Sequence, residues 1–172
     1  MLHKENLDQT LAHFDIEKSF SEDARQRLNR AWEHLPAWPD VANGMQLLRS
    51  FGFVAPCSNG SIALSIRLAR FAGFSWDTVL GAEVARNYKP KSEVYRAAVN
   101  ALALKPEEVV MVAAHNDDLE AASKEGLQTA FFPRVREYGP DQAKDHKAEK
   151  NWTYVATDLL DLASQICSER RA

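Results

Sequence analysis

The alternation of short apolar runs with helical segments in the second part of the chain is the feature that most constrains the fold. The runs have the apolar content of buried strands, and the segments between them repeat apolar residues at helical spacing. Strands that alternate with helices predict a three-layer α/β fold, in which a parallel sheet carries helices on both faces. The expected strands lie at 51–57, 78–80, 109–114, 129–132 and 152–156, the expected helices at 41–50, 62–71, 93–104, 119–125 and 158–167, and an irregular surface loop at 133–150.

The first part of the chain has a different pattern. Residues 6–35 repeat apolar positions at spacings of three and four, which predicts two helices in a hairpin. Pro36 and Pro39 then interrupt the pattern, because a proline disfavours helix in the residue before it. The sequence therefore predicts a helical part at 1–37 and an α/β part at 38–172.

The composition limits the classes of binding partner and the cellular compartments that we expect for the protein. Lys and Arg total 21 against 24 Asp and Glu, a net charge of −3, so the basic excess typical of nucleic-acid binding is missing. Cys57 and Cys167 are too few thiols for a disulfide framework or a cysteine zinc site. No apolar run approaches the roughly 20 residues that span a bilayer, and the first residues lack a signal-peptide pattern. We therefore expect a cytoplasmic protein with neither a nucleic-acid nor a membrane partner.

Polar residues stand where an α/β sheet places its ligands, outside the carboxyl ends of the strands. The segments to consider are Ser58-Asn59-Gly60, Tyr88-Lys89-Pro90 and His115-Asn116-Asp117-Asp118. Each has a structural alternative, since a Ser-Asn pair commonly turns the chain or caps a helix, and a lysine before proline fits an exposed loop. Asp117 with Glu120 fits the first turn of a helix, but that explanation does not need His115 or Asp118.

Taken together, these segments resemble the second, third and fourth motifs of the haloacid dehalogenase superfamily. The resemblance is closer to its type II group, the L-2-haloacid dehalogenases, in the phrases Leu35-Pro36-Ala37-Trp38-Pro39-Asp40-Val41, Gly81-Ala82-Glu83-Val84-Ala85-Arg86-Asn87-Tyr88-Lys89-Pro90 and Val112-Ala113-Ala114-His115-Asn116-Asp117-Asp118. It implies a Rossmann-like sheet with a helical cap. It also implies a small 2-haloacid or similar carboxylate as substrate. In that family an aspartate displaces the halide to form an ester, which water then cleaves.

The matching motif positions imply a set of site residues. They are Lys89, Asp118 and Ser58 as catalytic residues, and Ser58, Asn59, Tyr95 and His115 as substrate-binding residues. The Ser-Asn pair would hold the substrate carboxylate, and Lys89 would neutralise the charge of the nucleophile. Asp118 would hold Lys89 or position the hydrolytic water. His115 stands where well-studied dehalogenases have asparagine.

The fourth motif separates two branches of this superfamily. Phosphatase members typically carry Gly-Asp where this chain has Ala113-Ala114, and that aspartate binds magnesium through its oxygens. The alanine at this position favours the dehalogenase branch, which works without a metal or other cofactor. A magnesium-dependent phosphatase is the alternative within the superfamily.

The nucleophile of the family lies on an N-terminal strand with a pattern like Asp-x-Tyr-Gly-Thr, and residues 1–40 contain no such pattern. Asp8 and Asp15 are the nearest candidates, but both fall inside the helical pattern. Residues 1–37 instead resemble the last helices of the family's cap. We therefore expect an N-terminally truncated member that lacks its central first strand and is inactive in this form.

In the family, the first strand lies between the strands of the second and fourth motifs, so its absence would leave both without ladder partners. The gap could close by direct pairing, be filled by another segment, or be filled by residues upstream of Met1. A non-catalytic remnant that binds a partner or dimerises is the alternative from a different class. Because related enzymes are commonly dimeric, a homodimer is one expectation for the assembly.

Overall fold

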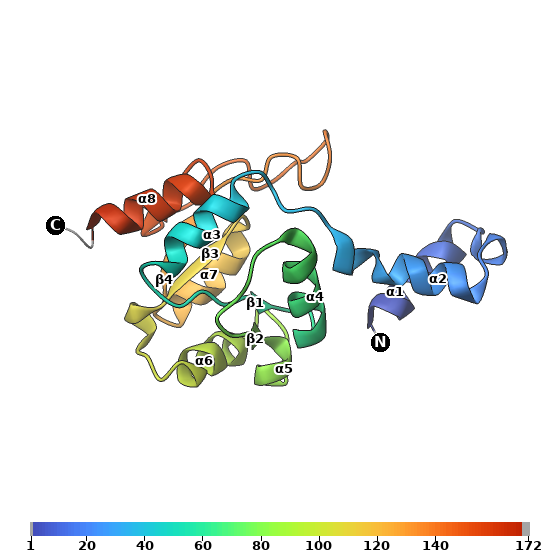
Figure 1. Cartoon of the computed structure of the whole chain (residues 1–172), viewed down its shortest axis with the longest axis horizontal. Coiled ribbons are helices and arrows are strands. Elements are labelled where there is room, and N and C mark those ends of the chain that lie inside the picture. Colours follow the sequence, from blue (N-terminus) through green and yellow to red (C-terminus); the bar gives the residue numbers. More distant parts are fainter. Residues whose placement is uncertain (1, 170–172) are drawn as a thin grey trace.

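The computed structural model describes residues 2–169 of the chain, with side chains from residue 4 onward (Figure 1). Residue 1 of the predicted helical part (1–37) and residues 170–172 of the predicted α/β part (38–172) lie outside the described residues. The helices are α1 (Leu2–His13), α2 (Glu22–Asn29), α3 (Val41–Arg49), α4 (Ile62–Ala72), α5 (Ala82–Ala85), α6 (Ser92–Ala101), α7 (Asn116–Lys124) and α8 (Leu159–Glu169), with short 3-10 helices at Glu17–Ser19, Arg30–His34 and Pro106–Glu108. The strands are β1 (Cys57–Ser58), β2 (Leu80–Gly81), β3 (Val110–Ala113), β4 (Gln128–Phe131) and β5 (Tyr154–Val155).

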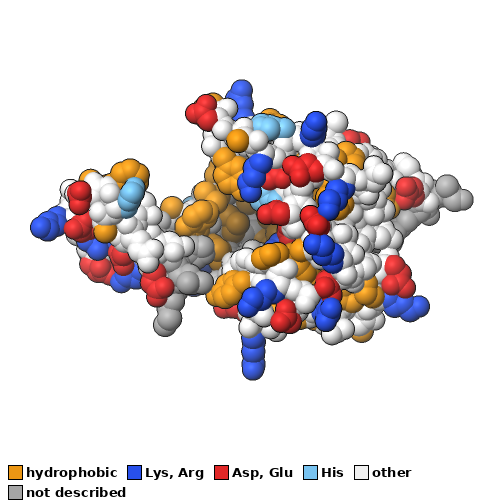
Figure 2. All heavy atoms as spheres, turned by 180° about the vertical axis from the view of Figure 1, so that it is seen from behind, with side chains coloured by type: hydrophobic (Ala, Val, Ile, Leu, Met, Phe, Trp, Pro, Cys, Tyr) orange, Lys and Arg blue, Asp and Glu red, His pale blue; other side chains and the backbone are white. Residues whose placement is uncertain are grey.

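The amino-terminal helices α1 and α2 lie to one side of a body that holds the described strands (Figure 1). The expected pair of helices is found there, and Ser21 begins α2 because its Oγ accepts a hydrogen bond of 3.2 Å from Ala24 N. The helical part contacts α4 through an ion pair with 2.7 Å between Arg67 Nη1 and Glu33 Oε1. Figure 2 shows hydrophobic side chains gathered around the recess where the helical part meets the body.

The strands form two separate parallel sheets. β1 pairs with β2 in one sheet, and the order in the other sheet is β3-β4-β5. Within residues 2–169, no ladder joins β1 to β3, and no other segment pairs with either strand in the space between them. The gap expected between the strands of the second and fourth motifs is therefore open in the described part of the chain, and direct pairing of the two strands is not found.

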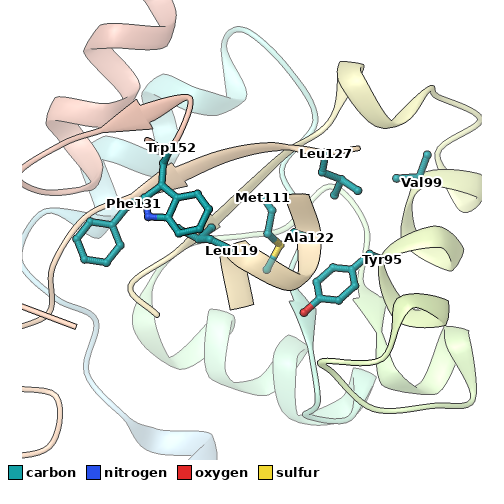
Figure 3. Packing of buried hydrophobic residues seen from close by; sticks show 8 residues of the cluster. All are labelled: Tyr95, Val99, Met111, Leu119, Ala122, Leu127, Phe131 and Trp152. Atoms are coloured by element: carbon teal, nitrogen blue, oxygen red, sulfur yellow. The ribbon is translucent and has the colours of Figure 1, made fainter. Parts of the chain in front are cut away.

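Side chains of β3 and β4 alternate between two apolar clusters on opposite faces of the larger sheet, as strand geometry requires. Met111 and Phe131 pack toward α6 and α7, whereas Ala130 and the following Phe132 pack toward α3 and α8. The first cluster contains Tyr95, Val99, Met111, Leu119, Ala122, Leu127, Phe131 and Trp152 (Figure 3). The second contains Met45, Ala130, Phe132, Ala156, Leu159 and Leu162. Helices thus cover both faces, and the predicted three-layer α/β fold is confirmed.

The strand predicted at 51–57 is shorter in the structure and begins only at its last residue, Cys57. Pro56 has no N–H to donate to a ladder. The amide of Val54 donates instead to the side chain of Asp77, at 2.8 Å. The other strands shortened to two residues are those predicted at 78–80 and 152–156.

The predicted helices of the body are all found, with ends displaced by a few residues. The largest changes are at α6, which ends at Ala101 instead of at residue 104, and at α7, which begins at Asn116 instead of at residue 119. The four-residue helix α5 was not expected from the sequence. Among residues 2–169, no helix is long and apolar enough to cross a membrane.

Candidate active site

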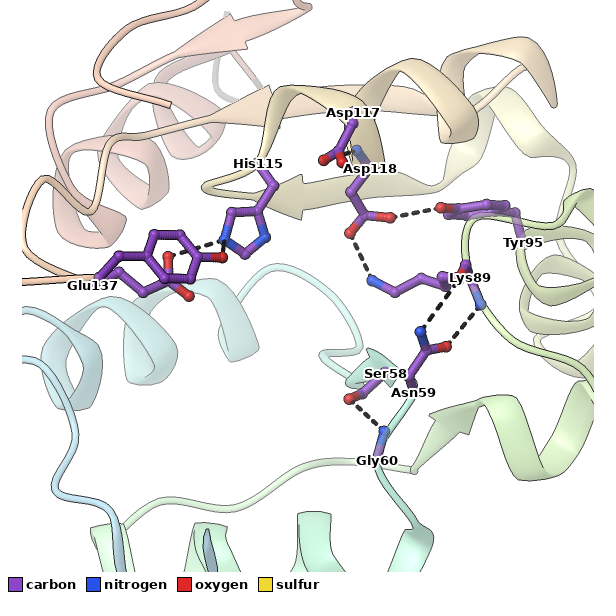
Figure 4. Close-up of polar contacts among 10 residues, drawn as sticks. Ser58, Asn59, Gly60, Lys89, Tyr95, His115, Asp117, Asp118 and Glu137 are labelled. Carbon is purple, nitrogen blue, oxygen red and sulfur yellow. Dashed lines mark hydrogen bonds and ion pairs between the residues drawn. The ribbon is translucent and has the colours of Figure 1, made fainter. Parts of the chain in front are cut away.

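Side chains that follow β1 and β3 converge with side chains from the start of α6 and from the segment before it (Figure 4). β1 leads into the Ser-Asn-Gly turn, and β3 leads into the amino-terminal turn of α7. Because parallel strands end at the same edge, this topology brings distant motifs to one place. All six residues proposed for the site from the sequence lie around this edge: Ser58, Asn59, Lys89, Tyr95, His115 and Asp118.

An ion pair between Lys89 and Asp118 lies at the centre of this group. Lys89 Nζ is 2.6 Å from Asp118 Oδ2, and the two side chains are only 18% and 14% exposed. The hydroxyl of buried Tyr95 donates to the other oxygen, Asp118 Oδ1, also at 2.6 Å. Burial, and then the contact with Asp118, raise the pKa of Tyr95, so the phenol keeps its proton as a donor. Both oxygens of Asp118 are therefore engaged, one by a cation and one by a hydroxyl.

Asn59 positions the backbone of Lys89. Its Oδ1 accepts a hydrogen bond of 2.7 Å from Lys89 N, and its Nδ2 donates to Lys89 O at 3.2 Å. Capping of α4, the structural alternative for this residue, is performed by other groups. The amide of Leu64 donates to Ser61 Oγ at 3.1 Å. One hydrogen of the Asn59 amide remains beyond the bond to Lys89 O, since a side-chain amide carries two.

Ser58 turns the chain and faces the same space. Its Oγ accepts a hydrogen bond of 3.0 Å from Gly60 N, as expected for the structural alternative of a turn. The hydroxyl can still donate its own hydrogen. Gly81 of the neighbouring strand packs directly against the backbone of Ser58. The turn function and a substrate contact are therefore compatible in this residue.

His115 contacts the loop at 133–150, which is irregular as predicted but is not only a solvated surface. His115 Nε2 lies 2.9 Å from Glu137 Oε2 and 3.3 Å from the hydroxyl of Tyr138. In Figure 4 the ring borders the same space as Lys89 and Ser58, from the opposite side. Sequence reasoning missed both loop residues, because nothing in the composition of this loop distinguishes them.

A buried network anchors this loop to the start of α7. Asp145 Oδ1 accepts hydrogen bonds from Asn116 N at 2.9 Å and from Asn116 Nδ2 at 3.0 Å. Asn116 Oδ1 in turn accepts from Trp152 Nε1 at 3.0 Å. Burial raises the pKa of Asp145, but the hydrogen bonds from Asn116 and the nearby His115 lower it by more, so the carboxylate stays ionised. Asp145 therefore caps α7 from a distant segment.

Asp117 lies in the first turn of α7, as its structural alternative predicts, but Asp117 and Glu120 do not cap the helix. Within the described part of the chain, Asp117 Oδ1 accepts only from the next amide, that of Asp118, at 2.9 Å, and the Glu120 carboxylate pairs with Lys124 and Lys150. Within residues 2–169, no group of three or more His, Cys, Asp or Glu side chains is arranged to hold a metal ion.

Comparison with known proteins agrees with this geometry. Residues 2–126 match the family model of the haloacid dehalogenase-like hydrolases. The match covers most of the chain, so the chain belongs to the haloacid dehalogenase-like hydrolase family. Within this family it resembles the type II group, the L-2-haloacid dehalogenases.

Two solved structures are similar along almost the whole chain. The L-2-haloacid dehalogenase PA0810 is 42% identical with a TM-score of 0.93, and the match covers 97% of this chain and 71% of that one. The defluorinating L-2-haloacid dehalogenase Rha0230 is 40% identical with a TM-score of 0.93, and the match covers 96% and 68%. The Rossmann-like arrangement expected from the resemblance is confirmed.

A similar curated protein is (S)-2-haloacid dehalogenase 4A of Burkholderia cepacia, which is 28% identical over 148 residues. The match covers 81% of this chain and 64% of that protein. The (S)-2-haloacid dehalogenase of Pseudomonas fluorescens is 28% identical over 158 residues, covering 90% of this chain and 66% of that protein. The chain thus spans just under two thirds of the length of these relatives.

Proposed function

We propose that this chain provides the substrate-binding and charge-stabilising residues of a 2-haloacid dehalogenase, with a nucleophilic carboxylate on a strand between β1 and β3. The observation that carries this proposal is the Lys89–Asp118 ion pair beside the ends of the two strands that border the open gap. A cation at this edge stabilises a carboxylate nucleophile and an anionic substrate together. The relatives named above are 2-haloacid dehalogenases, which supports this substrate class.

The proposed reaction has two steps. The carboxylate attacks the carbon that bears the halogen, the carbon–halogen bond breaks, and an ester remains on the protein. Water then cleaves the ester and releases a 2-hydroxy acid. The free hydrogens of Ser58 and Asn59 would bind the substrate carboxylate, while Lys89 stabilises the negative charge of the nucleophile. Tyr95 holds Asp118, which keeps Lys89 in place.

We extend the proposal to the organisation of the chain. Residues 1–37 would be the end of a helical cap, and residues 38–172 the α/β core without its first strand. The cytoplasm is the location we propose, because both cysteines are free and reduced thiols are typical of that compartment. The absence of a metal or other cofactor stays a prediction.

The open strand edges support a second candidate function, a module that binds a partner or dimerises. Unpaired backbone groups at a sheet edge can pair with a strand from another chain. This candidate predicts a homodimer whose population increases with protein concentration. Sedimentation at several concentrations tests it, and a monomer at every concentration would contradict it.

The proposed enzymatic activity can be tested by measuring halide release from a chain lengthened at its amino terminus, which we call the extended chain. The extended chain consists of residues 1–172 preceded by the amino-terminal segment of the PA0810 dehalogenase, which in this family carries the nucleophilic aspartate. We expect it to release halide and a 2-hydroxy acid from (S)-2-chloropropionate. A folded extended chain that releases no halide would contradict the proposal, and magnesium-dependent release of phosphate from an ester would favour the phosphatase instead.

Two matched variants locate the activity in the proposed site. Lys89→Met in the extended chain should lower turnover by about 100-fold or more, because it removes the cation beside the reacting carboxylates. Lys91→Met removes an exposed lysine two positions further on and should leave turnover unchanged. Equal losses in the two variants would contradict the role of Lys89.

A further inference from the structure

The contacts of His115 are those of a histidine held by a carboxylate. Glu137 Oε2 lies 2.9 Å from Nε2, and the Tyr138 hydroxyl lies 3.3 Å from the same nitrogen. The His115 and Glu137 side chains are about one third exposed, 33% and 35%, so the contact is at the rim of the site. An ionised carboxylate only accepts hydrogen bonds, so Nε2 must carry the hydrogen.

This arrangement leaves Nδ1 as the basic nitrogen of the ring. Among the described residues, none forms a hydrogen bond with His115 Nδ1. In Figure 4 this side of the ring faces the space that Lys89 and Ser58 border. A carboxylate on one imidazole nitrogen fixes the tautomer and stabilises the imidazolium that forms when the other nitrogen takes a proton. His115 is therefore arranged to accept a proton inside the site.

Asp118 is less suited to accept that proton. Its two oxygens already bind Lys89 Nζ and the Tyr95 hydroxyl, each at 2.6 Å. Protonation of Asp118 would remove the negative partner of a lysine that is itself only 18% exposed. Loss of one partner of a largely buried ion pair leaves an uncompensated charge, which is costly. Asp118 therefore fits a role in holding Lys89.

We propose that His115 is the general base that activates water for cleavage of the ester, and that Glu137 and Tyr138 position its ring. This inference rests on the proposed function above. Nδ1 takes a proton from water while the water oxygen bonds to the ester carbonyl carbon. The bond from that carbon to the substrate oxygen then breaks, and the departing oxygen takes the proton from Nδ1. The products are the 2-hydroxy acid and the free carboxyl group, which ionises.

The charges around His115 agree with this role. Glu137 and Asp145 of the loop both place carboxylates near the ring, and the Asp145 carboxylate is fixed by Asn116. Tyr138 adds a hydroxyl from the same loop, Asp117 and Asp118 follow on the helix that His115 begins, and the Lys89 cation stands across the space.

A substitution that leaves the first step intact tests the inference. In the extended chain, His115→Gln keeps a polar side chain but cannot accept the proton. With saturating substrate, which removes the effect of any lost binding contact on the first step, we expect one equivalent of halide per protein at an unchanged rate, followed by turnover about 100-fold slower, in line with the usual contribution of a general base. The ester should accumulate and be seen as an added mass on the protein.

The matched control is His146→Gln in the same loop; the hydrogen-bond partner of its Nε2 among the described residues is the carbonyl of Gln142, at 2.7 Å. It should leave both phases unchanged. In the unsubstituted extended chain, turnover should fall as the pH drops and His115 becomes protonated. His115→Gln should lose this limb of the profile, and a merely structural role would leave the limb in place. Unchanged turnover in His115→Gln, or a slower first release of halide, would overturn the inference while leaving the proposed function standing.

The chain of residues 1–172 offers an independent test that needs no turnover. NMR of the imidazole nitrogens should find His115 protonated at Nε2 and unprotonated at Nδ1 at pH values where the ring is neutral. Glu137→Gln should shift the population toward the other tautomer, because an amide can also donate to Nε2. A ring protonated at Nδ1 in the unsubstituted chain would overturn the inference, whatever the extended chain does.

Discussion

At the scale of single residues, Gly81 determines where Ser58 can lie. Its φ of +113° is a conformation that side chains rarely adopt, and a Cβ at this position would lie 2.2 Å from Ser58 O and 2.5 Å from Ser58 N. The backbone of β2 can therefore lie this close to Ser58 because residue 81 has no side chain.

Replacement of Gly81 by alanine should lower the free energy of unfolding by at least about 2 kcal/mol, because backbone strain and a steric clash combine. Urea denaturation measures this. Gly139→Ala is the matched control: its φ is +87°, but among the described residues, its two chain neighbours aside, no atom lies within 4 Å of the added Cβ. The control should lower the free energy of unfolding by about 1 kcal/mol, because alanine must adopt the left-handed conformation there but meets no steric clash. Equal losses in the two variants would show that the close approach is unimportant.

The sequence predicted site residues unevenly. Lys89 and Asp118 could be predicted because they lie within recognisable motifs. The topology of parallel strands brings such motifs together at one edge of the sheet. Glu137 and Asp145 could not, because they lie in a loop without periodicity and more than twenty positions from His115 and Asn116. Contacts of this kind depend on the path of the loop, which no local pattern encodes.

At the scale of elements, distant carboxylates hold the amino-terminal ends of three helices. Glu83 Oε2 accepts from Ile62 N at the start of α4, at 2.7 Å. Asp145 caps α7 in the same way. Asp40 Oδ2 accepts from Leu159 N at the start of α8, at 2.8 Å. A negative charge is favourable at a helix amino terminus, so each contact also fixes the helix relative to another segment.

Asp40 makes the most extensive of these contacts. Arg134 binds both of its oxygens, at 2.9 and 2.8 Å, and both side chains are 12% exposed. The guanidinium lies over the rings of Trp38 and Phe132, at 5.0 and 4.6 Å from their centres. Burial raises the pKa of Asp40, but the hydrogen bonds from Arg134 and Leu159 lower it by more, so its pKa lies below the ordinary value.

Asp40→Asn should destabilise the protein by about 2–4 kcal/mol at neutral pH, because Arg134 loses its charged partner. A depressed pKa contributes stability above the unfolded pKa of about 3.9, and the contribution is lost as the pH falls through the folded value. The difference in free energy of unfolding between Asp40→Asn and the unsubstituted protein should therefore become smaller below about pH 4. Urea denaturation at several pH values measures it.

Glu33→Gln, which breaks the more exposed pair with Arg67, is the control and should cost less than about 1 kcal/mol. A loss in Asp40→Asn that is constant down to the acid limit would contradict the assignment of this carboxylate as ionised. The ion pair between Asp40 and Arg134 joins the segment before α3 to the segment after β4. These segments are far apart in the sequence, so no local pattern predicts the pair.

Helices were easier to predict than strands for a physical reason. Helical periodicity and caps such as Ser61 and Gly73 are local, and α4 lies between these two residues, close to the helix predicted at 62–71. Strand length depends on the partner strand, and within residues 2–169 only one edge of β1 is paired. The apolar run at 51–57 therefore predicts a strand longer than the described residues form.

At the scale of the whole molecule, the open gap divides the body into two sheets. β4 is paired on both sides and contains the fully buried Ala130 and Phe131, whereas β1 is paired on one side only by the residues that the structure describes. Phe53, just before β1, is 83% exposed. An unpaired strand edge such as that of β1 is the arrangement expected where a further strand pairs.

Amide hydrogen exchange should report this division. In the chain of residues 1–172, amides of β4 should exchange slowest and those of β1 and β2 at least tenfold faster, because each 1.4 kcal/mol of local opening energy changes exchange tenfold. In the extended chain, the amides of β1 should become protected, while those of β4 change little. Uniform protection of both sheets without the added segment would contradict an open gap.

The central claim is that the two motif strands receive a third strand whose carboxylate forms an ester with the substrate. The most direct measurement is a single turnover of (S)-2-chloropropionate by an excess of the extended chain in water labelled with heavy oxygen. We predict that mass spectrometry finds the label in the aspartate of the added strand, and that the hydroxyl oxygen of the product is unlabelled. Label in the product hydroxyl and none in the protein would contradict the account, because water would then have displaced the halide directly.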